Sequence, residues 1–142
     1  MTPTVARRDP MPTPYSFTKL VVHDLKGMSA YYQQAYGLKE FDRVQAEIEG
    51  EAIDEVFLGV ESGHGPGAIT LLQYPDRPAP TPGAIILGFV TEDLDALVAA
   101  VEASGGRVTD GPRTSEAAPV RVAFTTDPEG NLAENVQVVA GG

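Results

Sequence analysis

Hydrophobic residues follow the same order in the two halves of the chain. Each half begins with a short apolar run rich in β-branched residues, at positions 17–22 and 85–90, which is typical of a strand. Apolar residues then recur every three or four positions, as on the buried face of a helix. Further strand-like runs follow at residues 41–46, 52–60 and 68–74 in the first half, and at 107–110, 120–125 and 132–139 in the second. The pattern therefore predicts a β-α-β-β-β unit in each half.

The residues at the ends of the two helical segments support this interpretation. Asp24 and Asp93 stand just before them, where a side-chain oxygen can accept hydrogen bonds from free backbone N–H groups. Gly37 follows the first and Gly105-Gly106 the second, as expected for a left-handed end of a helix. The interval along the chain from Asp24 to Asp93 equals the interval from Gly37 to Gly106. The halves thus align without a gap, which indicates duplication.

Prolines mark the limits of the two units. Residues 1–14 contain four prolines and are expected to form a flexible arm. A second proline cluster near the middle cannot lie inside a helix or a central strand, so we place a linker at residues 77–83. The first module then covers residues 15–76 and the second residues 84–142. We expect an α+β fold in which the two βαβββ modules form a curved mixed-sheet half-barrel around a cavity, with the helices outside.

Composition excludes several classes of function. The chain has 142 residues, a net charge of −10 and no cysteine. Disulfides and cysteine-ligated metals are therefore excluded. A protein that binds nucleic acids or anionic membranes needs a basic surface, and the net negative charge of this chain argues against one. No apolar run is long enough to span a bilayer, and the N-terminus lacks the apolar segment of a secretory signal. We expect a cytoplasmic protein with no nucleic-acid or membrane partner.

Two segments resemble a known family. Residues 19–38, KLVVHDLKGMSAYYQQAYGL, and residues 122–137, VAFTTDPEGNLAENVQ, look like the opening and the close of vicinal oxygen chelate proteins. That group includes glyoxalase I, ring-cleaving dioxygenases, fosfomycin-resistance enzymes and bleomycin-binding proteins. The resemblance covers about residues 15–139. It implies the paired βαβββ fold, a small-molecule ligand and a homodimer.

The resemblance also implies where a divalent metal would be bound. Members of the family typically use one side chain from the first and one from the last strand of each module. The matching positions here are Phe17, Thr70, Ile86 and Glu134. Only Glu134 is a good ligand, because Phe and Ile offer no lone pair and a Thr hydroxyl binds divalent ions poorly. We therefore expect no metal and no other cofactor.

Strand alternation predicts which side chains line the shared cavity. The expected substrate-binding residues are Phe17, Lys19, Thr70, Leu72, Tyr74 and Ile86. A mostly apolar cavity with a few polar groups is typical of a small-molecule site. Glu134 would lie in the same cavity, where burial raises the pKa of a carboxyl group, and is the candidate catalytic acid or base. In one alternative, Glu134 forms an ion pair with Lys19 and only shapes the pocket; in another, it is an inherited remnant.

Three functions fit these residues. The first is a metal-independent isomerase or lyase that uses Glu134 as acid or base. The second is a non-catalytic protein that binds or sequesters a small molecule or drug. The third is a metal-dependent glyoxalase-like lyase or dioxygenase, which needs ligands that the sequence does not show. We expect Tyr32 to pack in the core, and the acidic residues of segment 47–55 to lie on a solvated hairpin edge.

Overall fold

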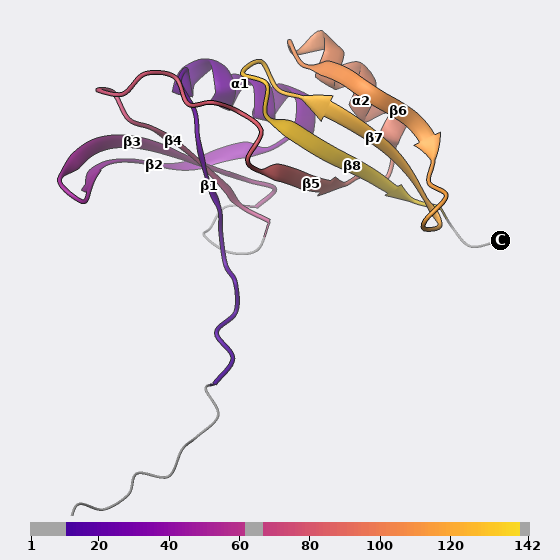
Figure 1. Cartoon of the computed structure of the whole chain (residues 1–142), viewed down its shortest axis with the longest axis horizontal. Coiled ribbons are helices and arrows are strands. Elements are labelled where there is room, and N and C mark those ends of the chain that lie inside the picture. The colour runs from indigo at the N-terminus through magenta and orange to yellow at the C-terminus, as the bar shows by residue number, and fades with distance from the viewer. Residues whose placement is uncertain (1–10, 62–66, 140–142) are drawn as a thin grey trace, which may run out of the picture.

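The computed structural model describes residues 11–61 and 67–139. This part of the chain forms two four-stranded sheets, each accompanied by one helix (Figure 1). Residues 1–10 of the predicted arm lie outside the described residues, and residues 11–14 contain neither helix nor strand. The two predicted βαβββ modules are confirmed.

The first module has the predicted order of elements. These are β1 (Lys19–Val21), α1 (Leu25–Tyr36), β2 (Lys39–Ile48), β3 (Glu51–Gly59) and β4 (Ile69–Gln73). The strands follow one another as β1-β4-β3-β2 across the sheet, with β1 parallel to β4 and the other pairs antiparallel. The first strand begins at Lys19, so Phe17 lies in the segment that leads into it.

The second module repeats this arrangement. Its elements are β5 (Ile86–Val90), α2 (Leu94–Ala103), β6 (Arg107–Thr114), β7 (Val120–Thr126) and β8 (Leu132–Val138), in the sheet order β5-β8-β7-β6. Strand β6 is longer than predicted. Asp110-Gly111-Pro112 is typical of a turn, but the strand continues through these residues with two shifts of register against β7.

The helix ends are formed largely as predicted. The side chains of Asp24 and Asp93 accept hydrogen bonds from the backbone N–H groups of Gly27 and Ala96, each at 3.0 Å. Gly37 adopts the left-handed conformation after α1, with φ of 68°. After α2 the left-handed residue is Gly105, with φ of 100°. Gly106 has a different role, since a Cβ atom there would lie 2.8 Å from the carbonyl oxygen of Thr126. Close packing, and not a left-handed backbone, requires glycine at this position.

The two modules share one hydrophobic core. Helices α1 and α2 pack against each other on the same side of the two sheets (Figure 1). The cluster of buried side chains combines Met28 and Tyr32 of α1 with Leu97 and Val101 of α2. Tyr32 is 1% exposed, which confirms its predicted place in the core. This helix pairing places the sheets side by side, with β1 and β5 at the neighbouring edges.

Polar and aromatic contacts fix the position of one module on the other. The hydroxyl of Tyr32 donates to Asp127 Oδ2 at 2.7 Å, and the hydroxyl of Tyr36 donates to Asn135 Oδ1 at 2.8 Å. The ring of Tyr36 stacks on Phe89 of β5, with 3.9 Å between the ring centroids. Helix α1 of the first module is thereby joined to the second module at several separate points.

Glu129 makes a further connection between the modules. It lies in the turn between β7 and β8, and its two carboxylate oxygens accept hydrogen bonds from the backbone N–H groups of His23 and Asp24, both at 2.7 Å. These N–H groups precede α1 and have no helical partner. The turn of the second module therefore caps the first.

Substituting Glu129→Ala should lower the free energy of unfolding by about 2 kcal/mol, since two hydrogen bonds to a charged acceptor are lost at a partly exposed site. Urea denaturation followed by circular dichroism measures this loss. Glu92→Ala, at an exposed position with no hydrogen bond to the described residues, is the control and should change stability by less than about 0.5 kcal/mol. Equal stabilities of the two variants would contradict the proposed cap.

Candidate functional site

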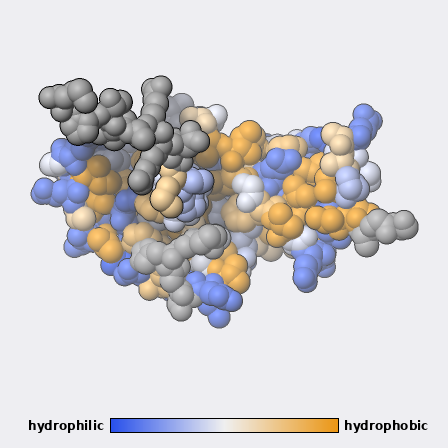
Figure 2. Space-filling model, turned by 90° about the horizontal axis from the view of Figure 1, so that it is seen from below, coloured by the Kyte–Doolittle hydropathy of each residue, from blue (hydrophilic) through white to orange (hydrophobic). Residues whose placement is uncertain are grey.

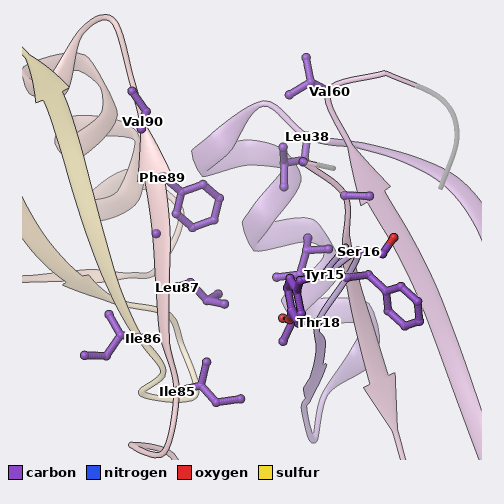
Figure 3. Close-up of a pocket in the computed structure, with 15 residues that line it drawn as sticks. Tyr15, Ser16, Thr18, Leu38, Val60, Ile85, Ile86, Leu87, Phe89 and Val90 are labelled. Carbon is purple, nitrogen blue, oxygen red and sulfur yellow. The ribbon is translucent and has the colours of Figure 1, made fainter. Parts of the chain in front are cut away.

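An apolar groove runs between the neighbouring edges of the two sheets (Figure 3). Its volume is about 600 Å³. In Figure 3, Ile85, Leu87 and Phe89 point from the β5 side toward the segment that holds Tyr15 and Thr18. Other large apolar side chains that line the groove are Phe17, Leu38, Val60, Ile86 and Val90. Each module thus supplies one wall.

The groove exists because β1 and β5 are both edge strands. Each is hydrogen-bonded to one neighbour only, β4 or β8, so a gap is left between the sheets. Large apolar side chains remain exposed there, with Phe17 at 55% and Ile86 at 58%. Removing such surfaces from water is favourable by about 25 cal/mol per Å², so an apolar ligand would be stabilised in the groove.

Two of the predicted substrate-binding residues lie at the groove. Phe17 of the first module and Ile86 of the second both line it. Tyr74 lines a separate hollow of about 310 Å³, where the guanidinium of Arg77 lies 3.7 Å from the centre of its ring. The predicted set is therefore divided among several places.

Lys19, Thr70 and Leu72 lie on the face of the first sheet that points away from α1. Lys19 is the cross-strand partner of Thr70, and Leu72 follows two residues later on the same face. The side chains of Thr70 and Leu72 are buried, at 2% and 1% exposure. None of the three lines the groove between the modules.

The alternative in which Lys19 forms an ion pair with Glu134 is wrong, because the ammonium of Lys19 pairs with Glu55 of β3. Glu55 is 4% exposed, so the prediction that the whole acidic segment is solvated is also wrong. Alternation along β3 places Ile53, Glu55 and Phe57 on one face of the sheet. The sequence of this segment does not indicate which of its acidic residues is buried. Burial of Glu55 depends on the ammonium of Lys19, which comes from another strand.

Glu134 lies on the outer face of the second sheet, between Gly88 of β5 and Phe124 of β7. Its side chain is exposed, contrary to the expectation that a cavity buries it. Among the described residues it forms no hydrogen bond or ion pair. Its neighbour Asn135, by contrast, is 0% exposed, and both the oxygen and the nitrogen of its side-chain amide form hydrogen bonds. The acid–base role of Glu134 stays a prediction.

The four positions that correspond to the family's metal ligands do not fit a metal. Phe17 and Ile86 carry hydrocarbon side chains, Thr70 is buried in the first sheet, and Glu134 is exposed on the second. Divalent cations need several oxygen or nitrogen donors that converge. In residues 11–61 and 67–139, no three His, Cys, Asp or Glu side chains are grouped so that they could hold a metal ion.

A comparison with family models gives a match over residues 15–134 to the Glyoxalase/Bleomycin resistance protein/Dioxygenase superfamily. The chain belongs to this superfamily. A search of curated proteins finds no match. Superfamily membership agrees with the resemblance of the two sequence segments and with the paired βαβββ modules. In the described residues, no helix combines the length and the apolar character needed to cross a bilayer.

Solved structures share the fold at low sequence identity. A glyoxalase family protein from Bacillus cereus has a TM-score of 0.73 and 17% identity, with 96% of this chain and 100% of that chain covered. The trypanothione-dependent glyoxalase I of Leishmania major has a TM-score of 0.67 and 19% identity, with 85% of this chain and 84% of that chain covered. A variant of glyoxalase I from Zea mays has a TM-score of 0.69 and 21% identity. That match covers 92% of this chain but only 48% of the plant chain, so this chain spans about half the length of the plant protein.

Some residues of the groove are not among those predicted from the sequence. Strand alternation assigns Leu87 and Phe89 to the helix-facing side of β5, and Phe89 does stack on Tyr36 of α1. Both residues also line the groove, because an edge strand has no neighbour to cover its side. Leu87 and Phe89 could be identified as lining residues only if β5 were known to be an edge strand that faces the other module. The sequence does not show this, because it depends on how the modules pack.

Proposed function

We propose that this protein binds a largely apolar small molecule in the groove between its two modules. The observation that carries the proposal is the groove itself, whose volume of about 600 Å³ lies in the range typical of ligand sites. Side chains of both modules line it, and most of them are apolar. Superfamily membership supports a small-molecule ligand, and it leaves open whether chemistry follows binding.

The lining of the groove favours binding over catalysis. Its described polar side chains are the hydroxyls of Tyr15, Ser16 and Thr18, and no carboxylate, imidazole or ammonium group is among the lining residues that the structure describes. Acid–base chemistry needs a group that exchanges protons near neutral pH within reach of the substrate. A binding or sequestering function therefore fits the lining better than that of an isomerase or lyase.

A homodimer and a cytoplasmic location remain expectations of this proposal. Figure 2 shows apolar side chains spread over the half of the surface that belongs to the second module. The exposed large apolar residues of the second sheet include Ile86 of β5 and Val138 of β8, at 58% and 63% exposure. Sedimentation velocity on the samples used for binding would give the number of chains per particle and hence the ligand stoichiometry.

The proposal is tested with 2-(1-naphthyl)ethanol, a neutral aromatic probe. The chain contains no tryptophan, so naphthalene emission is free of that background. We expect saturable binding that weakens about fivefold in Ile85→Ser, since about 1 kcal/mol of apolar contact is removed. Leu87→Ala should weaken it at least as much.

Val138→Ser is the matched control, because Val138 is an exposed apolar residue of the second sheet that does not line the groove. Its affinity for the probe should equal that of the parent protein. Thermal unfolding of each variant shows whether the fold is retained. Absence of saturable binding, or an equal loss in Val138→Ser, would contradict the proposed site.

A further inference from the structure

We infer that the ligand of this groove is an organic cation, whose charged group pairs with Glu134 while its apolar part lies between the modules. The inference rests on the function proposed above and adds the chemical class of the ligand. It depends on three features: the position of Glu134 beside the groove, an opening at Gly88, and a lining whose described residues carry no positive charge.

The carboxylate of Glu134 lies one strand away from the groove. Gly88 lines the groove on β5, and Glu134 is its cross-strand partner on β8. Adjacent strands are about 4.8 Å apart, and partner residues project from the same face of a sheet. Glu134 is exposed and forms no hydrogen bond or ion pair with any described residue. A negative charge without a partner is therefore available next to the apolar site.

Gly88 opens the way from the groove to this charge. Ile86 and Val90 project from the same face of β5, one on each side of Gly88, and both are exposed. At Gly88 itself a Cβ atom would meet no other atom within 4 Å. The row of side chains along β5 is thus interrupted directly beside Glu134. A ligand lying against β5 can extend a charged group through this interruption.

The charges around the groove favour a cation over an anion. Within residues 11–61 and 67–139, the lining includes no Lys, Arg or His. The nearest lysine along the first strand, Lys19, is paired with Glu55. The whole chain carries a net charge of −10, which raises the local concentration of cations and repels anions.

Three probes with the same naphthyl group separate charge from apolar contact: 2-(1-naphthyl)ethylammonium, 2-(1-naphthyl)ethanol and 1-naphthylacetate. In the parent protein we expect the cation to bind about fivefold more tightly than the alcohol, as for one partly exposed charge pair at about 5 Å. The acetate should bind more weakly than the alcohol. Raising the salt concentration should reduce the preference for the cation.

Two variants test the route to Glu134. Glu134→Gln removes the charge, and Gly88→Val closes the interruption with a side chain that suits a strand and has free space. Each should make the ammonium and alcohol probes bind equally, and in Glu134→Gln, which is outside the groove lining, the affinity for the alcohol should change little. Glu102→Gln removes the same unit of charge from an exposed position on α2 and should keep the fivefold preference.

The outcomes separate this inference from the proposed function. Alcohol binding that is sensitive to Ile85→Ser, but without a preference for the cation, overturns the inference and leaves the proposed function intact. A preference that survives Glu134→Gln, or that is lost equally in Glu102→Gln, also overturns it, since the net charge alone would then be responsible. If none of the probes binds, both the inference and the proposed function fail.

Discussion

Raising the pH from 10 to 11 should lower the free energy of unfolding by about 2 to 3 kcal/mol. Tyr31, Tyr32 and Tyr36 all have a raised pKa in the folded protein, chiefly because burial disfavours the charged phenolate. The carboxylate of Asp127 adds to the rise at each of them. Tyr32 donates its proton to this carboxylate in a hydrogen bond, which a phenolate cannot form.

The sign of this effect follows from proton binding. Unfolded tyrosines lose their protons near pH 10, whereas the folded protein keeps them to higher pH, so the folded state binds more protons in this range. Stability is therefore complete below about pH 9 and is lost as the pH rises toward the folded-state pKa. Each tyrosine contributes up to about 1.4 kcal/mol per pH unit, which makes the cluster the largest pH-dependent term we expect.

Urea denaturation at pH 8, 9, 10 and 11, followed by circular dichroism, measures this profile. Tyr31→Phe provides the control, because it removes one of the three titrating groups while Tyr32 and Tyr36 keep their hydrogen bonds to Asp127 and Asn135. The loss between pH 10 and 11 should then shrink by about one third. A flat profile from pH 9 to 11 in the parent protein would contradict the prediction.

The fold could be predicted from the sequence because its signals are local. Asp24 and Asp93 cap helices through contacts with residues three positions away, and the apolar period of each strand and helix is carried by neighbouring residues. The repeat of these signals at a constant interval then predicts two modules. Only the ends of elements differ, as in β6, where a turn-like tripeptide is accommodated by shifts in register.

The candidate site could be predicted only in part, because it depends on how the modules pack. The sequence places Phe17 and Ile86 at equivalent positions, and both line the groove. It does not show that α1 and α2 pair and so set the sheets side by side. Nor does it show that Lys19 has a partner on β3. These contacts join residues far apart in the chain.

Replacing Asn135 by alanine should be among the most damaging single substitutions, with an expected loss of about 3 to 5 kcal/mol in the free energy of unfolding. The side chain is 0% exposed. Its Nδ2 donates to the carbonyl of Ala123 at 3.1 Å and to Thr125 Oγ1 at 2.9 Å, while its Oδ1 accepts from Tyr36. Alanine removes these hydrogen bonds from a buried site, at about 1 to 3 kcal/mol each before relaxation, and leaves Tyr36 and Thr125 only the longer contact of 3.3 Å between their hydroxyl oxygens.

The same urea titration at neutral pH measures this loss, with Gln45→Ala as the control for removing an amide from an exposed strand position. Gln45→Ala should cost less than about 0.5 kcal/mol. The double variant Tyr36→Phe/Asn135→Ala should lose about 1 kcal/mol less stability than the sum of the two single losses. Each single variant already removes the hydrogen bond between the two side chains, so the double variant cannot lose it a second time. A loss below about 1 kcal/mol for Asn135→Ala would show that water replaces these bonds, and that the contact between α1 and β8 does not hold the modules together.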